Sequence, residues 1–291
     1  MRHLCLIMNF ETQPYTHAET KPFMSTKYSA KPSGQRFSIK DGLKFLAAAG
    51  LLTWFMFISA DRLHYNWQWY RVPKYLFTMV NGSFISGPLL EGVWVTLRIT
   101  AAGLVLSCIF GLVTALLRLS ESFAAKTIAR LYMELVRNTP LLVQIFFIYF
   151  VVSPVLGIGR FTSAILALSL FEGAYASEIF RAGIVSIHKG QWEAAHSVGL
   201  NTLNTYRHII LPQAIRRMLP PLASQAISLI KDSALVSTIA IYDLTMQGQR
   251  IIAETYMVFE LWFTIAIIYL FMTAALSVGI NIMEKRLTIE M

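Results

Sequence analysis

Residues 191–215 form a polar stretch between segments that are otherwise strongly apolar. The residues whose types and spacing define this stretch are Glu193, Ala194, Ala195, Gly199, Leu211 and Pro212. The first three begin a helical pattern, the glycine can end it because glycine tolerates positive φ, and the Leu-Pro pair marks entry into the next apolar run. We expect a helix, a turn and a second helix. Small side chains allow close approach of another protein, and a first-turn carboxylate suits the positive end of the helix dipole.

Charged side chains inside apolar runs are the second group of candidate functional residues. Glu172, Lys231 and Asp232 would each cost about 2.5 to 3.5 kcal/mol at bilayer depth, so they require a protein interior or water. Ser228 lies four residues before Asp232 and extends one polar stripe along a helix. We expect these four residues to line a path through the bundle, where paired opposite charges would suit a solute that carries both charges. The alternative is that the charges pair with one another or with a partner subunit and hold a bundle together.

The composition places the chain among polytopic membrane proteins. Of its 291 residues, 55% are hydrophobic and 14% are charged, and the mean hydropathy is +0.54. Soluble domains carry about 25% charged residues. The formal charge of +9 does not indicate nucleic-acid binding, because the basic residues lie in short segments beside apolar runs instead of on one face. We expect an all-α transmembrane bundle embedded in lipid.

Six apolar runs are long enough to be considered as membrane crossings. They cover residues 43–60, 89–117, 140–156, 161–180, 220–241 and 259–282. The remaining segments are an N-terminal tail at 1–42, an outer segment at 61–88, an amphipathic connection at 118–138, the polar loop at about 185–218, and a C-terminal tail at 283–291. Pro220 and Pro221 are expected to open the fifth crossing.

The distribution of Lys and Arg gives the expected orientation. Of 25 such residues, 18 fall in segments that a cytoplasmic N-terminus places inside, five fall outside, and Arg98 and Lys231 remain within the membrane. The positive-inside rule therefore places both termini and the 185–218 loop in the cytoplasm. Near the same side, Glu178 precedes Arg181 by three residues, which predicts a local ion pair on a helix.

Small residues and turn signals give further local expectations. Gly103, Ser107 and Gly111 recur at four-residue intervals, which lets a second helix pack closely on that stripe. Turns are expected at 81–83 and at 157–160, where glycines interrupt the apolar pattern.

The polar stretch resembles the EAA loop of ATP-binding-cassette (ABC) importer permeases. The spacing of Glu193 to Ala195, Gly199, Ile209, Leu211 and Pro212 matches that pattern in full. Other segments are similar to the polar amino acid branch of these permeases, and they lie at 137–144, 172–183, 219–221 and 231–232. The resemblance covers roughly residues 85–286, and the chain departs from it by adding the tail and the 43–60 run.

This resemblance implies a fold, a function and partners. The fold would be a five-helix type I importer core with one added N-terminal helix. The 193–212 motif residues would contact an ATPase subunit, and the chain would form the translocation path for a polar amino acid. The implied partners are two ABC ATPase subunits, a second permease subunit that is identical or homologous, and a periplasmic or surface binding protein. The implied location is a bacterial inner membrane.

ATP is expected to bind elsewhere. The chain lacks the G-x-x-x-x-G-K-[ST] phosphate loop, so ATP and Mg²⁺ would be held by a partner subunit and this chain would carry no cofactor and no metal. An ion-coupled secondary transporter or channel that uses the membrane charges is the alternative. An intramembrane enzyme is disfavoured because no nucleophile and base pair is evident. The sequence leaves open which amino acid is transported and whether the permease partner is identical.

Overall fold

The computed structural model describes residues 42–44, 46–48, 50–51, 53–54, 65–80 and 82–289. The chain divides into two units, at 9–67 and from Gln68 onward, and each is considered by itself. The predicted tail at 1–42 lies outside the described residues except for its last position, and the predicted crossing at 43–60 is described only in part. The described positions between 42 and 54 are helical.

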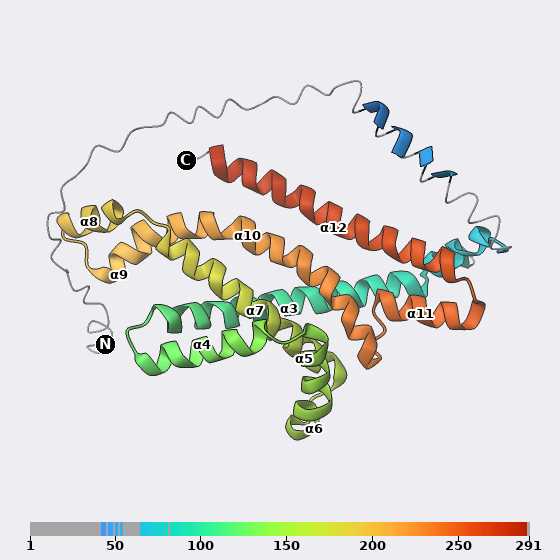
Figure 1. Cartoon of the computed structure of the whole chain (residues 1–291), viewed down its shortest axis with the longest axis horizontal. Helices are drawn as coiled ribbons and strands as arrows, with labels where there is room; N and C mark the ends of the chain where they lie inside the picture. Colours follow the sequence, from blue (N-terminus) through green and yellow to red (C-terminus); the bar gives the residue numbers. More distant parts are fainter. Residues whose placement is uncertain are drawn as a thin grey trace. The chain divides into compact units, whose positions relative to one another are not determined.

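The larger unit is almost entirely helical (Figure 1). Its elements are η1 (Trp69–Arg71), α2 (Pro73–Leu76), β1 (Phe77–Val80), β2 (Ser83–Ser86), α3 (Pro88–Leu119), α4 (Phe123–Arg137), α5 (Leu141–Phe147), η2 (Ile148–Val152), α6 (Ser153–Leu156), α7 (Arg160–Val185), α8 (Lys189–Ser197), α9 (Thr202–Thr205), η3 (Tyr206–Ile210), α10 (Leu211–Asp232), η4 (Ser233–Ile239), α11 (Leu244–Thr255) and α12 (Val258–Ile289). The all-α bundle is confirmed. The predicted C-terminal tail at 283–291 begins inside α12.

Three helices in the described residues are long and apolar enough to cross a membrane: α3, α7 and α12. They coincide with three of the six predicted crossings. The crossing predicted at 140–156 corresponds to the helical segment from α5 to α6. This segment follows α4 after a bend of 107°, and α4 together with this segment gives a fourth span if the two are counted as one broken helix. The predicted crossing at 220–241 corresponds to α10 and η4. Neither of these helices is both long enough and apolar enough to count as a membrane span by itself.

The start of α10 corrects one expectation. Pro220 and Pro221 lie inside this helix instead of opening it, and the helix begins at Leu211 with Pro212 in its first turn. Proline is accepted at the first turn because its missing N–H has no intrahelical partner there. Prolines inside membrane helices are tolerated when neighbouring groups satisfy the freed carbonyls. As a result, α10 runs without a break from the polar loop to Asp232, its last residue.

A short hairpin precedes α3 and was not predicted. Strands β1 and β2 pair antiparallel, with Phe77 opposite Ser86 and Val80 opposite Ser83. The turn predicted at 81–83 is confirmed at Gly82, which has a φ of +77°. A positive φ at this place is typical of tight hairpin turns.

The long helices α3 and α7 pack closely through small residues. A Cβ added at Gly111 would lie 2.7 Å from the Cβ of Ala176, and one added at Gly173 would lie 2.9 Å from the Cβ of Phe110. A Cβ at Gly103 would lie 3.2 Å from Leu229 of α10. The predicted stripe on α3 is therefore a helix-packing face, as expected where backbones approach closely.

Candidate functional site

The polar loop folds as a helix, a turn and a second helical segment, as predicted. Helix α8 ends in a Schellman motif in which the N–H of Leu200 bonds to the carbonyl of Ala195 at 3.1 Å and that of Gly199 bonds to His196 at 2.9 Å. Gly199 has a φ of +78°, the left-handed conformation that this motif requires. The glycine therefore stops α8 and turns the chain toward α9 (Figure 1).

The loop packs on a small core of its own. Ile184, Ile187 and Ile210 are buried there together with Ala214 and Met218, and the ring of Trp192 packs at their edge. Arg217 of α10 donates from Nη1 to the carbonyl of Ser186 at 2.6 Å, which ties α10 to the end of α7. Because these contacts join α7, α8 and α10, the loop is attached firmly to the bundle.

The outer surface of the loop carries most of the predicted docking residues. Glu193, Ala194 and Gly199 are exposed, and so are Leu211 and Pro212 at the start of α10. Ala195 is different, because it is only 4% exposed. It packs inward and supports the helix, so in this chain its side chain does not lie on the loop surface.

Two further surface residues were missed by the sequence analysis. Val198 is 75% exposed and Leu203 is 74% exposed, and they flank the Gly199 turn. Their exposure makes them candidates for contact with another protein. The sequence offered one indication of them. Val198 directly precedes Gly199 and Leu203 follows it by four residues, so both lie next to the predicted turn and outside the apolar face of a long helix.

The structure brings together two of the four predicted substrate-path residues. Glu172, in the middle of α7, is 3% exposed, and its Oε2 has no N–H or hydroxyl donor in the part of the chain that the structure describes. The carboxyl group of Asp232, at the end of α10, lies close enough to interact with it. The result is a pair of acids, with Glu172 buried and Asp232 half-buried, where opposite charges were expected from the sequence.

Lys231 and Ser228 lie differently from this pair. Lys231 is exposed and forms no ion pair with Glu172 among the described residues, although its charge acts on Asp232. Ser228 is half-buried, one turn before Asp232. Glu172 therefore belongs to the interior of the bundle, Asp232 is half-buried beside it, and Lys231 lies at the surface.

Glu178 near the end of α7 forms more than the predicted local ion pair. Its carboxylate lies 3.1 Å from Arg181 Nη2, 2.8 Å from Arg118 Nη1 at the end of α3, and 3.6 Å from Arg137 Nη1 at the end of α4. One carboxylate thus joins three helices at the end of the bundle that carries the loop.

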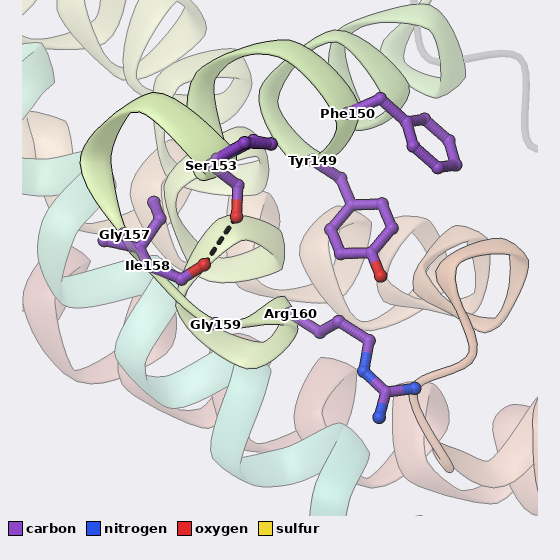
Figure 2. Close-up of a pocket in the computed structure, with 8 residues that line it drawn as sticks. Tyr149, Phe150, Ser153, Gly157, Ile158, Gly159 and Arg160 are labelled. Carbon is purple, nitrogen blue, oxygen red and sulfur yellow. Dashed lines mark hydrogen bonds between the residues drawn. The ribbon is translucent and has the colours of Figure 1, made fainter.

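A separate cavity lies at the other end of α7 (Figure 2). It has a volume of about 520 Å³ and is lined by Tyr149, Phe150, Ser153, Pro154 and residues 157–160. Arg160 donates from Nη1 to the carbonyl of Ala240 at 3.1 Å, and the hydroxyl of Ser153 donates to the carbonyl of Ile158. Gly157 has a φ of +65°, which confirms the predicted turn. None of the predicted site residues lines this cavity.

Comparison with known proteins identifies the family. Residues 107–289 match the family described as binding-protein-dependent transport system inner membrane component. The chain belongs to this family. It is therefore a permease subunit of an ABC importer, and it is not an enzyme, because ATP hydrolysis belongs to a separate subunit. This membership decides against the alternative of an ion-coupled secondary transporter or channel.

Individual relatives agree with this assignment. The chain is 40% identical over 204 residues to the glutamine transport system permease protein GlnP of Escherichia coli (strain K12), which covers 69% of this chain and 93% of the relative. It is 38% identical over 203 residues to the L-cystine transport system permease protein TcyB of Bacillus subtilis (strain 168), with 69% and 87% covered.

Solved structures share the fold. A crystal structure of an amino acid ABC transporter with histidines aligns with a TM-score of 0.64 at 38% identity, covering 68% of this chain and 94% of that chain. The MetNI methionine ABC transporter in an inward-facing conformation aligns with a TM-score of 0.58 at 18% identity, covering 68% and 95%. The second likeness concerns the fold alone. Together they show that this permease has the fold of ABC importer permeases.

Proposed function

We propose that this permease imports a polar amino acid and that an ATPase subunit drives its helices through the 185–218 loop. The coupling role rests on the exposed surface of this loop. Its outer surface presents Glu193, Ala194 and Gly199 beside the exposed side chains of Val198 and Leu203. A surface that combines small residues with open apolar side chains is suited to close docking of another protein.

The pair of acids formed by buried Glu172 and half-buried Asp232 supports an amino acid as the substrate. Glu172 and Asp232 place two carboxyl groups side by side, and Ser228 adds a hydroxyl one turn away. Such groups accept hydrogen bonds from the α-ammonium group of an amino acid, while a buried carboxylate oxygen without a donor costs free energy until it is paired. The relatives that transport glutamine and L-cystine are named for substrates with this ammonium group. In this proposal the ammonium group of Lys231, at the edge of the path, binds the carboxylate of the substrate.

The assembly follows from the same proposal. Two ATPase subunits bind ATP and Mg²⁺, a second permease subunit completes the path, and a binding protein delivers the substrate on the outer side. The loop end of the bundle then faces the cytoplasm of a bacterial inner membrane, with both termini on that side. This orientation agrees with the excess of Lys and Arg in the segments assigned to the inside.

Uptake by the reconstituted complex tests the substrate assignment. Proteoliposomes would be supplied with ATP inside and with labelled amino acids and the binding protein outside. Glu172→Gln and Asp232→Asn are each expected to reduce uptake at least tenfold, because the loss of one charge-assisted hydrogen bond costs about 1.5 to 3 kcal/mol. Glu254→Gln is the matched control, since Glu254 forms an exposed pair with Arg250 at 3.3 Å. Unchanged uptake in both acid-pair variants would rule out the pair as the substrate site.

A further inference from the structure

A basic pocket lies between α3, α4 and α7 at the end of the bundle that carries the loop. Its volume is about 420 Å³. The residues that line it are Arg118, Lys126, Arg130, Met133, Glu134, Arg137, Glu178 and Arg181. Five cationic side chains face two carboxylates in this pocket, so it carries a net positive charge.

The charges inside the pocket are only partly compensated. Glu178 is shared by Arg118, Arg137 and Arg181, so one negative charge serves three guanidinium groups. Lys126 and Arg130 form no ion pair within the described residues of the chain. Arg137 also lies over the ring of Tyr175, 5.5 Å from its centroid, which holds this guanidinium in place. An anion entering the pocket would therefore meet three arginines held by Glu178 and two cations, Lys126 and Arg130, that are exposed and without an ion pair in the described residues.

The other face of α4 indicates where that anion comes from. Ile128, Leu131 and Leu135 are large apolar side chains that share this face and are exposed. The helix is attached to the bundle by the hydroxyl of Tyr132, which donates to the carbonyl of Leu170 at 2.5 Å, and by buried Ala129 and Met133. A short helix with one exposed apolar row and one basic row is typical of the boundary between lipid and water.

We propose that this pocket binds the phosphate headgroup of an anionic phospholipid of the leaflet on the loop side. The acyl chains lie along the apolar row of α4, and the phosphate oxygens accept hydrogen bonds from Lys126, Arg130 and the guanidinium groups around Glu178. Basic pockets between membrane helices bind such headgroups by this combination of charge and position. The proposal does not depend on which solute the permease carries.

Lipid titration of the purified transporter with its ATPase subunits tests the proposal. The complex in detergent is titrated with phosphatidylglycerol, and the bound lipid is counted by native mass spectrometry. Lys126 and Arg130 each contribute about fivefold to binding of an anionic headgroup, so the Lys126→Gln, Arg130→Gln double variant is expected to bind about 30-fold more weakly. Lys285→Gln is the control, because Lys285 is an exposed cation at the end of α12 and outside the pocket.

The outcomes separate a lipid from other ligands. The proposal expects wild type to bind phosphatidylglycerol more tightly than phosphatidylcholine, with the Lys285→Gln control unchanged. Equal affinity of wild type and the double variant for phosphatidylglycerol would overturn it. Full displacement of the lipid by millimolar inorganic phosphate would also overturn it, since the pocket would then be a site for free anions. Folding of the variant is checked by retention of its ATPase subunits.

Discussion

The rings of Trp192 and Tyr206 meet edge to face across the Gly199 turn, with their centroids 5.0 Å apart and their planes at 82°. Trp192 belongs to α8, and Tyr206 begins η3, which continues into α10. This contact therefore links the docking surface to the helix that ends at Asp232. Under the proposed coupling role, a displacement of α8 by a bound ATPase would be transmitted to α10 through these two rings.

Loss of this ring contact should uncouple the permease from its ATPase subunit. Trp192→Ala removes an aromatic pair that contributes about 0.5 to 1.5 kcal/mol beyond its buried area, so α8 would move without carrying α10. We expect ATP hydrolysis to lose most of its stimulation by substrate-loaded binding protein, while the complex stays assembled. Trp192→Phe keeps a ring in place and should retain most of the stimulation. Full stimulation in Trp192→Ala would show that the contact carries no coupling.

The exposed apolar pair on the loop should determine docking of the ATPase. Val198→Ser and Leu203→Ser, made singly and together as a double loop variant, remove apolar surface that is exposed in the permease alone. Each single change should weaken retention of the ATPase subunit during purification by about 5-fold to 30-fold. This range corresponds to the loss of about 1 to 2 kcal/mol of apolar contact. Val155→Ser in α6 is a control, because Val155 is equally open but lies away from the loop. Wild-type retention in the double loop variant would contradict the predicted docking surface.

The close approach of α3 and α7 predicts a stability effect at Gly111. Gly111→Ala places a methyl group 2.7 Å from Ala176, so the helices must separate, at a cost of about 1 to 3 kcal/mol. The Tm in detergent should fall by roughly 2 to 4 °C per kcal/mol. Ala176→Gly added to this variant should restore part of the loss. Gly279→Ala should leave the Tm nearly unchanged, since nothing lies within 4 Å of that position. Equal Tm values for the Gly111 and Gly279 variants would refute the packing argument.

Buried Asp243 predicts a pH dependence of stability. It caps α11 by accepting the N–H of Met246 at 2.9 Å, and it also lies near the hydroxyl of Tyr269. Burial raises the pKa of Asp243 to about 6, against about 3.9 in an unfolded chain. Between these values the folded state holds a proton that the unfolded state has released, so stability falls as pH rises from about 4 to 6 and is then constant.

Asp243→Asn isolates this contribution because asparagine keeps the helix cap without titrating. The variant should show no Asp243-dependent fall in apparent Tm between pH 4 and pH 6, whereas the wild type should lose on the order of 2 to 3 kcal/mol of stability there. The comparison is made by thermal unfolding in detergent across that range. Parallel profiles of wild type and variant would show that Asp243 does not titrate in this window.

Local rules explain the features that were predicted correctly from the sequence. The turns at Gly82, Gly157 and Gly199 depend on a positive φ, which is a property of single residues. The close packing at Gly111 followed from small residues on one face of a helix, although the partner helix was not predicted. These signals need no knowledge of which helices become neighbours.

The missed features depend on the direction of a side chain or on contacts distant in sequence. Lys231 and Asp232 are adjacent, and successive residues on a helix point about 100° apart, so only one of them can face Glu172. The sequence does not say which one. The pairing of Glu178 with Arg118 likewise joins helices that are far apart in the chain. Ala195 is the buried residue of α8, which periodicity over only nine residues does not reveal.

The ratio of amino acid taken up to ATP hydrolysed, measured in proteoliposomes with Gly199 variants, tests the central claim most directly. Nothing lies within 4 Å of a Cβ at Gly199, so a side chain there meets only a partner protein. Alanine is small but is strained at a φ of +78°, whereas asparagine accepts that conformation and is larger. If force passes through a closely docked loop, Gly199→Asn should lower the ratio about tenfold or more, and Gly199→Ala should lower it less. A wild-type ratio in Gly199→Asn would contradict the account.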